Sequence, residues 1–295
     1  MISEATLKQR SLPPSGTNNK CKQTYFLVKE RIEQTLIDDN FDIFLQWSYA
    51  NSTNIKEDSD VDIVVCRNNI HRDNFWFMGR NSNYLSQYNI DYSRKSFYDF
   101  KIKVERALFW EFWNSITRKN KCLRIDISNY NLVNADIVPT YELHKFINDW
   151  RYYPWIALFS DDGTYIENFP KMHQKNWEEK NQRTNWMYKD MVRLIKNCKA
   201  YYSDIYNDNS KVISSFMIEN CLWNIESNIY LTNYWTKTNL CNCVIKELLR
   251  KLQHPWDFRE ICNLRKLFDW ANNKYTPQQV QSFFILMYKL INGQI

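Results

Sequence analysis

The sequence predicts an α/β half followed by an all-helical half. Before Pro170, segments that alternate apolar and polar residues with the period of two typical of strands stand between segments of helical periodicity. After Pro170, apolar residues recur almost entirely at helical spacing. A chain of 295 residues suits about two domains. We therefore expect one domain at 1–165 and a second, helical domain at 166–295.

Within the first half, residues 21–40 carry apolar side chains at i, i+3 and i+4, which predicts a helix. Residues 41–49 alternate with a period of two, which predicts a strand. Residues 66–95 show little periodicity and are expected to form a surface insertion. The same two periods predict further strands at 61–65, 123–127 and 132–138, and further helices at 96–116, 178–202, 211–228, 239–252, 258–271 and 277–291.

Composition excludes several classes of protein. Hydrophobic residues make up 44% and aromatic residues 16%, which excludes a disordered chain, a collagen and a coiled-coil rod. The four glycines are scattered, so neither a Walker A loop nor a Rossmann fingerprint is present. The net charge of 39 − 33 = +6 is mild and comes without long basic runs, so stable binding of nucleic acid is not expected.

The sequence also bears on location and on thiol chemistry. The first 16 residues lack the apolar core of a secretory signal, and no apolar segment of about 18 residues is present, so we expect a cytoplasmic protein without membrane contact. Eight cysteines are scattered along the chain, of which Cys241 and Cys243 form a CxC pair. Without a second pair this is a weak zinc signal, and reduced thiols are the alternative.

The most informative motif is Asp60-Val61-Asp62 at the start of a predicted strand. Residues i and i+2 of a strand project from the same face, so the two carboxylates converge. Their repulsion favours a divalent cation between them, and Mg²⁺ prefers carboxylate and phosphate oxygens. A solvated strand end is the alternative. Asp136 lies between apolar residues in a later predicted strand and also needs a partner, because an isolated buried acid is costly.

Longer segments carry a family resemblance. Residues 45–65, LQWSYANSTNIKEDSDVDIVV, together with Asp136, resemble the polymerase-β-like nucleotidyltransferases, in which a Gly-Ser turn, a DxD strand and a third acid follow one another. Residues 164–196, TYIENFPKMHQKNWEEKNQRTNWMYKDMVRLIK, look like the NxPKxH…KNxxT…FKxxVRxxK stretch of the bacterial cGAS/DncV-like nucleotidyltransferases, closest to clade E. Residues 214–219, SSFMIE, are similar to the SFLIE helix start of that clade. The resemblance covers roughly residues 20–230.

This resemblance implies a bilobed fold with a central active-site cleft. Its nucleotidyltransferase core would be a mixed sheet flanked by helices, with an N-terminal spine helix, and a C-terminal helical bundle would follow. The implied activity is template-independent synthesis of a cyclic dinucleotide from nucleoside triphosphates in bacterial anti-phage (CBASS) signalling. The clade implies a pyrimidine-containing product such as cyclic di-UMP or cyclic UMP-AMP, with UTP as a substrate and ATP or CTP as the other candidates. We expect a monomer.

The resemblance also assigns the catalytic residues. Asp60, Asp62 and Asp136 would hold two Mg²⁺ ions, for which Mn²⁺ is the alternative, about 3.5–4 Å apart. One ion would lower the pKa of the attacking hydroxyl, and the other would steady the triphosphate and the leaving pyrophosphate.

Five further positions match nucleotide-binding residues of the family: Gln46, Ser48, Asn168, Lys196 and Ser215. Ser48, Lys196 and Ser215 would contact the phosphates, and a lysine point charge and a helix start both suit that role. Asn168 would recognise the nucleobase, because an amide offers a donor and an acceptor to uracil. An exposed helix lysine and an ordinary turn asparagine are the alternatives for Lys196 and Asn168.

One residue departs from the family pattern. Trp47 stands where the family has the glycine of the Gly-Ser turn, and a glycine there lets the backbone approach phosphate closely. The sequence therefore leaves open a second class of function, a nucleotide-binding or partner-binding pseudoenzyme of the same fold. A third alternative is another branch of the superfamily that makes linear products or acts as an antitoxin.

Overall fold

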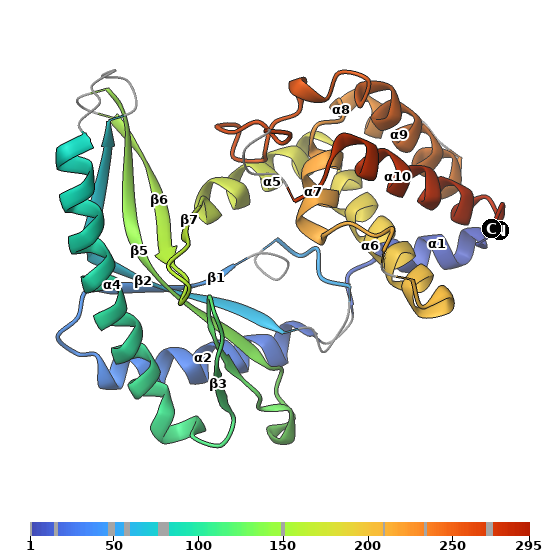
Figure 1. Cartoon of the computed structure of the whole chain (residues 1–295). Coiled ribbons are helices and arrows are strands. Elements are labelled where there is room, and N and C mark those ends of the chain that lie inside the picture. The colour runs from blue at the N-terminus through green and yellow to red at the C-terminus, as the bar shows by residue number, and fades with distance from the viewer. Residues whose placement is uncertain are drawn as a thin grey trace. The chain divides into compact units, whose positions relative to one another are not determined.

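The computed structural model divides the chain into two compact units (Figure 1). The sheet unit comprises Ser15–Ala50 and Lys56–Lys171, and the helical unit comprises Met1–Pro14, Asn51–Ile55 and Met172–Ile295. Met1–Pro14 and Asn51–Ile55 belong to the helical unit because side chains of that unit bind them. The expected division at residue 165 did not place these two segments in the helical domain. The structure describes residues 2–14, 17–46, 51–55, 60–75, 83–148, 151–208, 210–232, 235–269 and 274–295.

In the described part of the sheet unit, seven strands form one sheet, and it is mixed, as the resemblance implied. Four neighbours along it run β1-β2-β5-β4, with β3 beyond β4, while β6 pairs with β5 and β7 with β6. Strands β2 and β5 are parallel and the other pairs are antiparallel. The strands are β1 Phe41–Gln46, β2 Val61–Phe75, β3 Ile116–Arg118, β4 Leu123–Ile125, β5 Ala135–Asn148, β6 Arg151–Phe159 and β7 Tyr165–Asn168.

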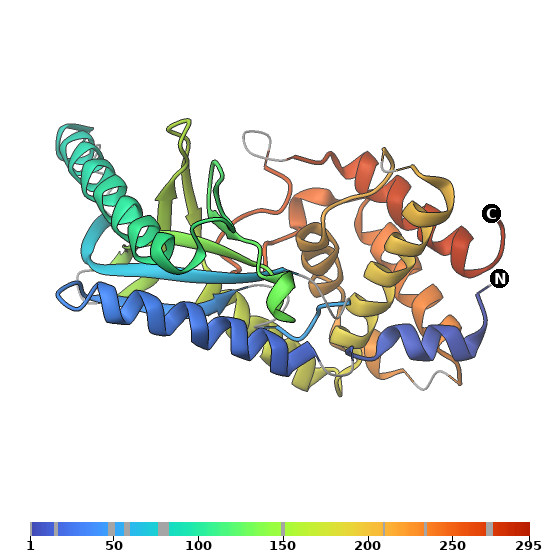
Figure 2. The ribbon, with the colours of Figure 1, turned by 90° about the horizontal axis from the view of Figure 1, so that it is seen from below.

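Two long helices, α2 (Thr17–Thr35) and α4 (Asn83–Phe112), pack on one face of this sheet (Figures 1 and 2). The alternate apolar residues of β2 and β5 point to that face and form a buried core with the two helices. Its central members are Val28, Ile32, Val61, Ile63, Val65, Phe100, Val104, Ala135 and Ile137. The opposite face of the same strands carries a smaller apolar cluster around Val64, Cys66 and Ile156, and leaves the ends of the strands for polar groups.

The expectation of a surface insertion at 66–95 is wrong for the residues that the structure describes there. Strand β2 continues to Phe75 and helix α4 begins at Asn83. The extended β2 keeps pairing with β5 past an irregularity between Arg67 and His71. Backbone hydrogen bonds can form a strand whatever its side chains are. The spacing of hydrophobic residues therefore gave no indication that β2 extends so far.

The helical unit is built around α6 (Met187–Tyr206), which contributes ten buried residues to it. Helix α10 (Pro277–Ile291) coincides with the predicted helix, and it begins with a capping box between Thr276 and Gln279. The other helices are α1 Glu4–Ser11, α5 Pro170–Arg183, α7 Ser215–Trp223, α8 Ser227–Leu231 and α9 Lys237–Lys251. No helix in the described residues is long and apolar enough to cross a membrane.

The helix predicted at 258–271 is wrong. The chain folds back on itself there, with a β-bridge between Arg259 and Lys266. Asn263 has a left-handed φ of 59° at the tip, which a helix does not allow. Phe258, Ile261 and Leu267 are nevertheless buried, so their spacing imitates a helix. We call residues 258–267 the hairpin segment.

A charged network ties α4 to the turn after β6. The ammonium of Lys101, whose side chain is fully buried, donates to Asp161 Oδ1 at 2.7 Å. Arg118 donates to both carboxylate oxygens of Asp161 at 2.9 Å. Arg118 first, and then Lys101, lower the pKa of Asp161 to about 2 against the smaller effect of burial.

Asp161→Asn should destabilise the protein by about 2 kcal/mol at neutral pH, because it leaves the Lys101 charge buried without its counter-ion. The folded-state pKa of Asp161 is lowered, so its contribution is present above the unfolded pKa and is lost as the pH falls towards about 2. Urea unfolding across that range measures both effects. As a control, Glu33→Gln removes an exposed partner of Lys29 and should cost less than about 0.5 kcal/mol. Equal losses in the two variants would contradict a role for the buried charge.

Candidate active site

The DxD motif lies where β2 enters the sheet. Asp62 is directly opposite Gln46 on β1 and Asp136 on β5, and Asp136 is opposite Arg124 on β4. Directly paired residues project from the same face, and neighbouring strands are about 4.8 Å apart. These four side chains therefore form a line across four strands, on the face opposite α2 and α4. We call it the polar row.

Asp60 joins the polar row through Arg124. The guanidinium donates to the two carboxylate oxygens of Asp60 at 2.5 and 3.0 Å, and it lies 3.6 Å from Asp136 Oδ1. Lys119 is 3.9 Å from the same oxygen of Asp136. The structure thus gathers Asp60, Asp62 and Asp136 at one place, and two cations of the protein partly neutralise them.

The electrostatics of this cluster favour further positive charge. Burial, and then the charges of Asp136 and Asp60, raise the pKa of Asp62 to about 7. Asp136 Oδ1 is buried and accepts no hydrogen bond from the described residues. A carboxylate oxygen in that condition is costly unless a cation approaches it. The donor set, carboxylate oxygens alone, is the kind that Mg²⁺ or Mn²⁺ prefers.

Gln46 ends β1 with its side chain almost fully buried. Its Nε2 has no hydrogen-bond partner among the residues that the structure describes. Since Gln46 is paired with Asp62, its amide belongs to the same face as the acids. Ser48 and Trp47 follow directly in the chain but lie outside the described residues, so the predictions on both stay predictions.

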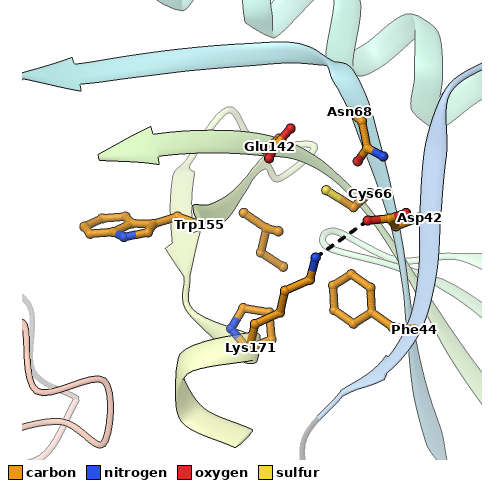
Figure 3. A pocket seen from close by; sticks show the side chains of 9 residues that line it. Asp42, Phe44, Cys66, Asn68, Glu142, Trp155 and Lys171 are labelled. Atoms are coloured by element: carbon orange, nitrogen blue, oxygen red, sulfur yellow. Dashed lines mark ion pairs between the residues drawn. The ribbon is translucent and has the colours of Figure 1, made fainter. Parts of the chain in front are cut away.

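The face that carries the polar row continues along β2 into a small hollow (Figure 3). Cys66 and Ile156 line it, and Lys171 points across it to Asp42 at 3.6 Å. Its volume of about 20 Å³ holds roughly one water molecule. Asn168, opposite Ile156 in the sheet, accepts the amide of Phe169 with its own Oδ1 at 2.8 Å. The turn role of Asn168 is thus observed, and its nucleobase role stays a prediction.

Lys196 and Ser215 belong to the helical unit. Ser215 begins α7, as predicted, while Ser214 caps that helix by accepting the amide of Met217. Lys196 is 4% exposed, so it is not the exposed helix lysine that the sequence left open. Its ammonium donates to the Thr53 carbonyl at 2.7 Å and to Glu219 Oε1 at 3.1 Å. Two of the three donors of the ammonium are thus occupied, and the phosphate role of Lys196 stays a prediction.

The same contacts hold segment 51–55 to the helical unit. Thr53 donates its hydroxyl to Glu219 Oε1 at 2.9 Å, and Arg193 donates to the carbonyl of Ser52 at 2.7 Å. Another donor of Arg193 binds the carbonyl of Ser11 at 2.7 Å, so one guanidinium binds both short segments of this unit. We call Lys196, Glu219 and Arg193 the loop clamp.

Sequence reasoning missed two charged residues at these places, Arg124 and Glu219. Arg124 lies in a predicted strand, but its relation to Asp60 and Asp136 depends on which strands pair. Glu219 lies in the SSFMIE segment, where an acid in an apolar run was the available signal, since a buried acid demands a partner.

The mixed sheet, with an acidic pair on one strand and a third acid on its parallel neighbour, defines the class: a polymerase-β-like nucleotidyltransferase. The profile of the cGAS/DncV-like nucleotidyltransferase C-terminal helical domain matches residues 175–292. A cyclic dipurine nucleotide synthase of Elizabethkingia meningoseptica is 30% identical, over 99% of this chain and 98% of the relative. The chain belongs to the cGAS/DncV-like nucleotidyltransferases, in clade E, the CdnE group.

Two further comparisons agree with this assignment. A cyclic dipyrimidine nucleotide synthase CdnE of Legionella pneumophila is 30% identical, over 98% of this chain and 97% of the relative. The solved structure of Elizabethkingia meningoseptica CdnE cyclic dinucleotide synthase with GTP and Apcpp is 28% identical, covers 97% of each chain and has a TM-score of 0.80. The expected fold class, a mixed-sheet core followed by a helical domain, is confirmed.

Glu219→Gln should destabilise the protein by about 3 kcal/mol, because it leaves the Lys196 charge, 5% exposed, without a counter-charge. Chemical denaturation followed by circular dichroism measures the loss. The matched control is Glu226→Gln, whose carboxylate is 61% exposed and pairs with Lys251; we expect a loss below about 1 kcal/mol there. If both variants lose the same small amount, the loop clamp contributes no more than a surface pair.

Proposed function

We propose that this chain is a metal-dependent synthase that joins two nucleoside triphosphates into a cyclic dinucleotide. The observation that carries the proposal is the polar row, which aligns Asp62 and Asp136 on adjacent parallel strands with Asp60 beside them. Three carboxylates on one sheet face suit a metal-assisted displacement at phosphorus. The named relatives, which are synthases of cyclic dinucleotides, support the reaction class.

Asp60, Asp62 and Asp136 are the residues that would hold two Mg²⁺ ions, with Mn²⁺ as the alternative. The residues fit these ions: all donors are carboxylate oxygens, and one of them, Asp136 Oδ1, is buried without a hydrogen bond from the described residues. When bound, the metal lowers the pKa of the attacking hydroxyl and stabilises the leaving pyrophosphate. Arg124 would give up part of its contact with Asp60 to allow this.

In the proposed reaction the 3′-hydroxyl of one nucleotide attacks the α-phosphorus of the other. The hydroxyl loses its proton, the bond to the pyrophosphate oxygen breaks, and a second attack of the same kind closes the ring. The protein acts mainly by positioning and by neutralising charge. Lys196 and Ser215 would contact the phosphates of the triphosphate. Gln46, at the end of β1, and Ser48 would also bind the nucleotide.

The proposal for the nucleobases of the product depends on Asn168. Relatives equally similar to this chain make dipurine products in one case and dipyrimidine products in another, so similarity alone does not choose. The Asn168 side chain is oriented by its bond to the Phe169 amide, and its amide can pair with the N3–H and O4 of uracil. We therefore propose a product that contains uridine, formed from UTP with ATP or CTP as the second candidate, as a signal in anti-phage (CBASS) defence.

Asp136→Asn should lower the rate of product formation by about a thousandfold or more, because it removes a metal-binding charge from the centre of the polar row. The assay incubates the protein with all four nucleoside triphosphates and Mg²⁺, followed by phosphatase treatment and mass analysis, since a ring survives phosphatase. The control is Asp204→Asn on an exposed position of α6, which should keep full activity. Normal turnover by Asp136→Asn would refute the metal assignment. Tight nucleotide binding without product from the unaltered chain would favour the pseudoenzyme.

Asn168→Ala should raise the KM for UTP by about tenfold or more relative to purine triphosphates, because two hydrogen bonds to the base are lost. The kcat with the preferred purine should change much less. Asn228→Ala, an exposed asparagine of α8, is the control. An unchanged ratio of kcat/KM for UTP and purines in Asn168→Ala would mean that this residue serves the turn alone.

A further inference from the structure

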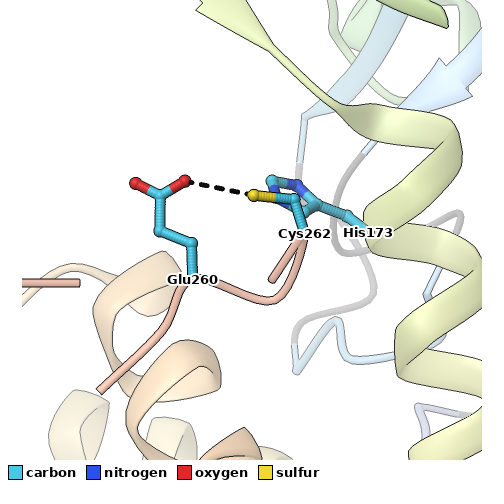
Figure 4. A group of neighbouring side chains, drawn as sticks. All are labelled: His173, Glu260 and Cys262. Atoms are coloured by element: carbon cyan, nitrogen blue, oxygen red, sulfur yellow. Dashed lines mark hydrogen bonds between the residues drawn. The ribbon is translucent and has the colours of Figure 1, made fainter. Parts of the chain in front are cut away.

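A second group of metal-ligating side chains lies within the helical unit, in residues that the proposed reaction does not use. His173 comes from the first turns of α5, and Glu260 and Cys262 come from the hairpin segment (Figure 4). One ligand atom of each lies within 4.8 Å of the others. Within the part of the chain that the structure describes, it is the one group of three or more such residues whose ligand atoms all lie within 4.8 Å of one another.

The distances are close to those of a tetrahedral zinc site. Zn–S bonds of about 2.3 Å and Zn–O or Zn–N bonds of about 2.0 Å place neighbouring ligand atoms roughly 3.5 Å apart. The Cys262 thiol donates to Glu260 Oε2 across 3.6 Å, so this pair already has the required separation. One imidazole nitrogen of His173 lies within 4.8 Å of the sulfur and of a carboxylate oxygen of Glu260 (Figure 4).

The hairpin segment is held in place independently of any ion. Asn220 Oδ1 accepts the amide of Ile261 at 2.8 Å, and Asn176 Nδ2 donates to the carbonyl of the same residue at 2.5 Å. Asn224 both donates to and accepts from the backbone of Arg259, at 2.7 and 2.9 Å. The residues on either side of Glu260 are thus fixed by helices α5 and α7, so the ligands are preorganised.

The ligand chemistry is that of a soft divalent cation. His173 is 2% and Cys262 1% exposed. Burial, with the charge of Arg265, lowers the pKa of His173 to about 4. Burial raises the pKa of Cys262 to about 11, while backbone amides of Leu264 and Arg265 bond its sulfur and oppose that rise.

We propose that His173, Glu260 and Cys262 bind one Zn²⁺ ion, with a water molecule as the fourth ligand on the partly exposed side of Glu260. A thiolate and an imidazole select zinc over magnesium, whereas the polar row offers oxygen alone. The ion fastens the hairpin segment to α5 and takes no part in the chemistry. Its binding releases the thiol proton, and any proton on Glu260, to solvent.

The test uses the full chain, with Co²⁺ as a spectroscopic probe and Zn²⁺ as the competing ion. One equivalent of Co²⁺ should produce a thiolate-to-cobalt charge-transfer band that Zn²⁺ abolishes and Mg²⁺ does not. The band should be absent in Cys262→Ser. The band should persist in Cys122→Ser, the matched control. Cys122 lies in the electrostatic field of Asp136, so a band lost in this variant would mean that cobalt binds at the polar row instead.

Thermal unfolding gives a second readout. Zn²⁺ should raise the Tm of the unaltered chain and of Cys122→Ser by at least about 3 °C relative to chelator-treated protein, and should leave Cys262→Ser unchanged. His173→Gln provides the same comparison if Cys262→Ser does not fold. No charge-transfer band in the unaltered chain, or a band retained in both Cys262→Ser and His173→Gln, would overturn the proposal. Either result leaves the proposed synthase untouched, because the activity assay depends on Asp136.

Discussion

The arrangement of the sheet unit depends on the register between β2 and β5, which holds Asp62 directly beside Asp136 although like charges repel. The apolar face of the same strands fixes that register. Val61 and Ile63 are fully buried against α2 and α4, and a shift of one residue would exchange them with Asp62. The hydrophobic effect on one face therefore holds together charges on the other face that would otherwise separate. Arg124, opposite Asp136 on β4, offsets part of the cost from within the protein.

Sequence periodicity predicted what is local to one element. The DxD pair was predicted from the period of two alone, and α10 from its apolar spacing and from Pro277. The prediction that Asp136 joins this pair came from a family resemblance, because no local pattern states which strands are neighbours. Arg124 was missed for the same reason. The hairpin segment was mistaken for a helix because Phe258 and Ile261 have helical spacing. The left-handed conformation of Asn263 is incompatible with a helix there.

The loop clamp shows how one residue admits two interpretations. A lysine on a helix suits a phosphate, as the family match at Lys196 implied, but in the fold its ammonium is paired with Glu219 and with the Thr53 carbonyl. The fold therefore gives Lys196 a structural contact, and its phosphate role stays a prediction.

Two metal sites in one chain need ligands that do not compete. The three acids of the polar row offer carboxylate oxygens, which suit the hard ion proposed for them. The His173–Cys262 pair is buried and soft, and Glu260 adds a single charge. Zinc binds carboxylates as well, so selection between the two proposed ions at the polar row has to come from their availability.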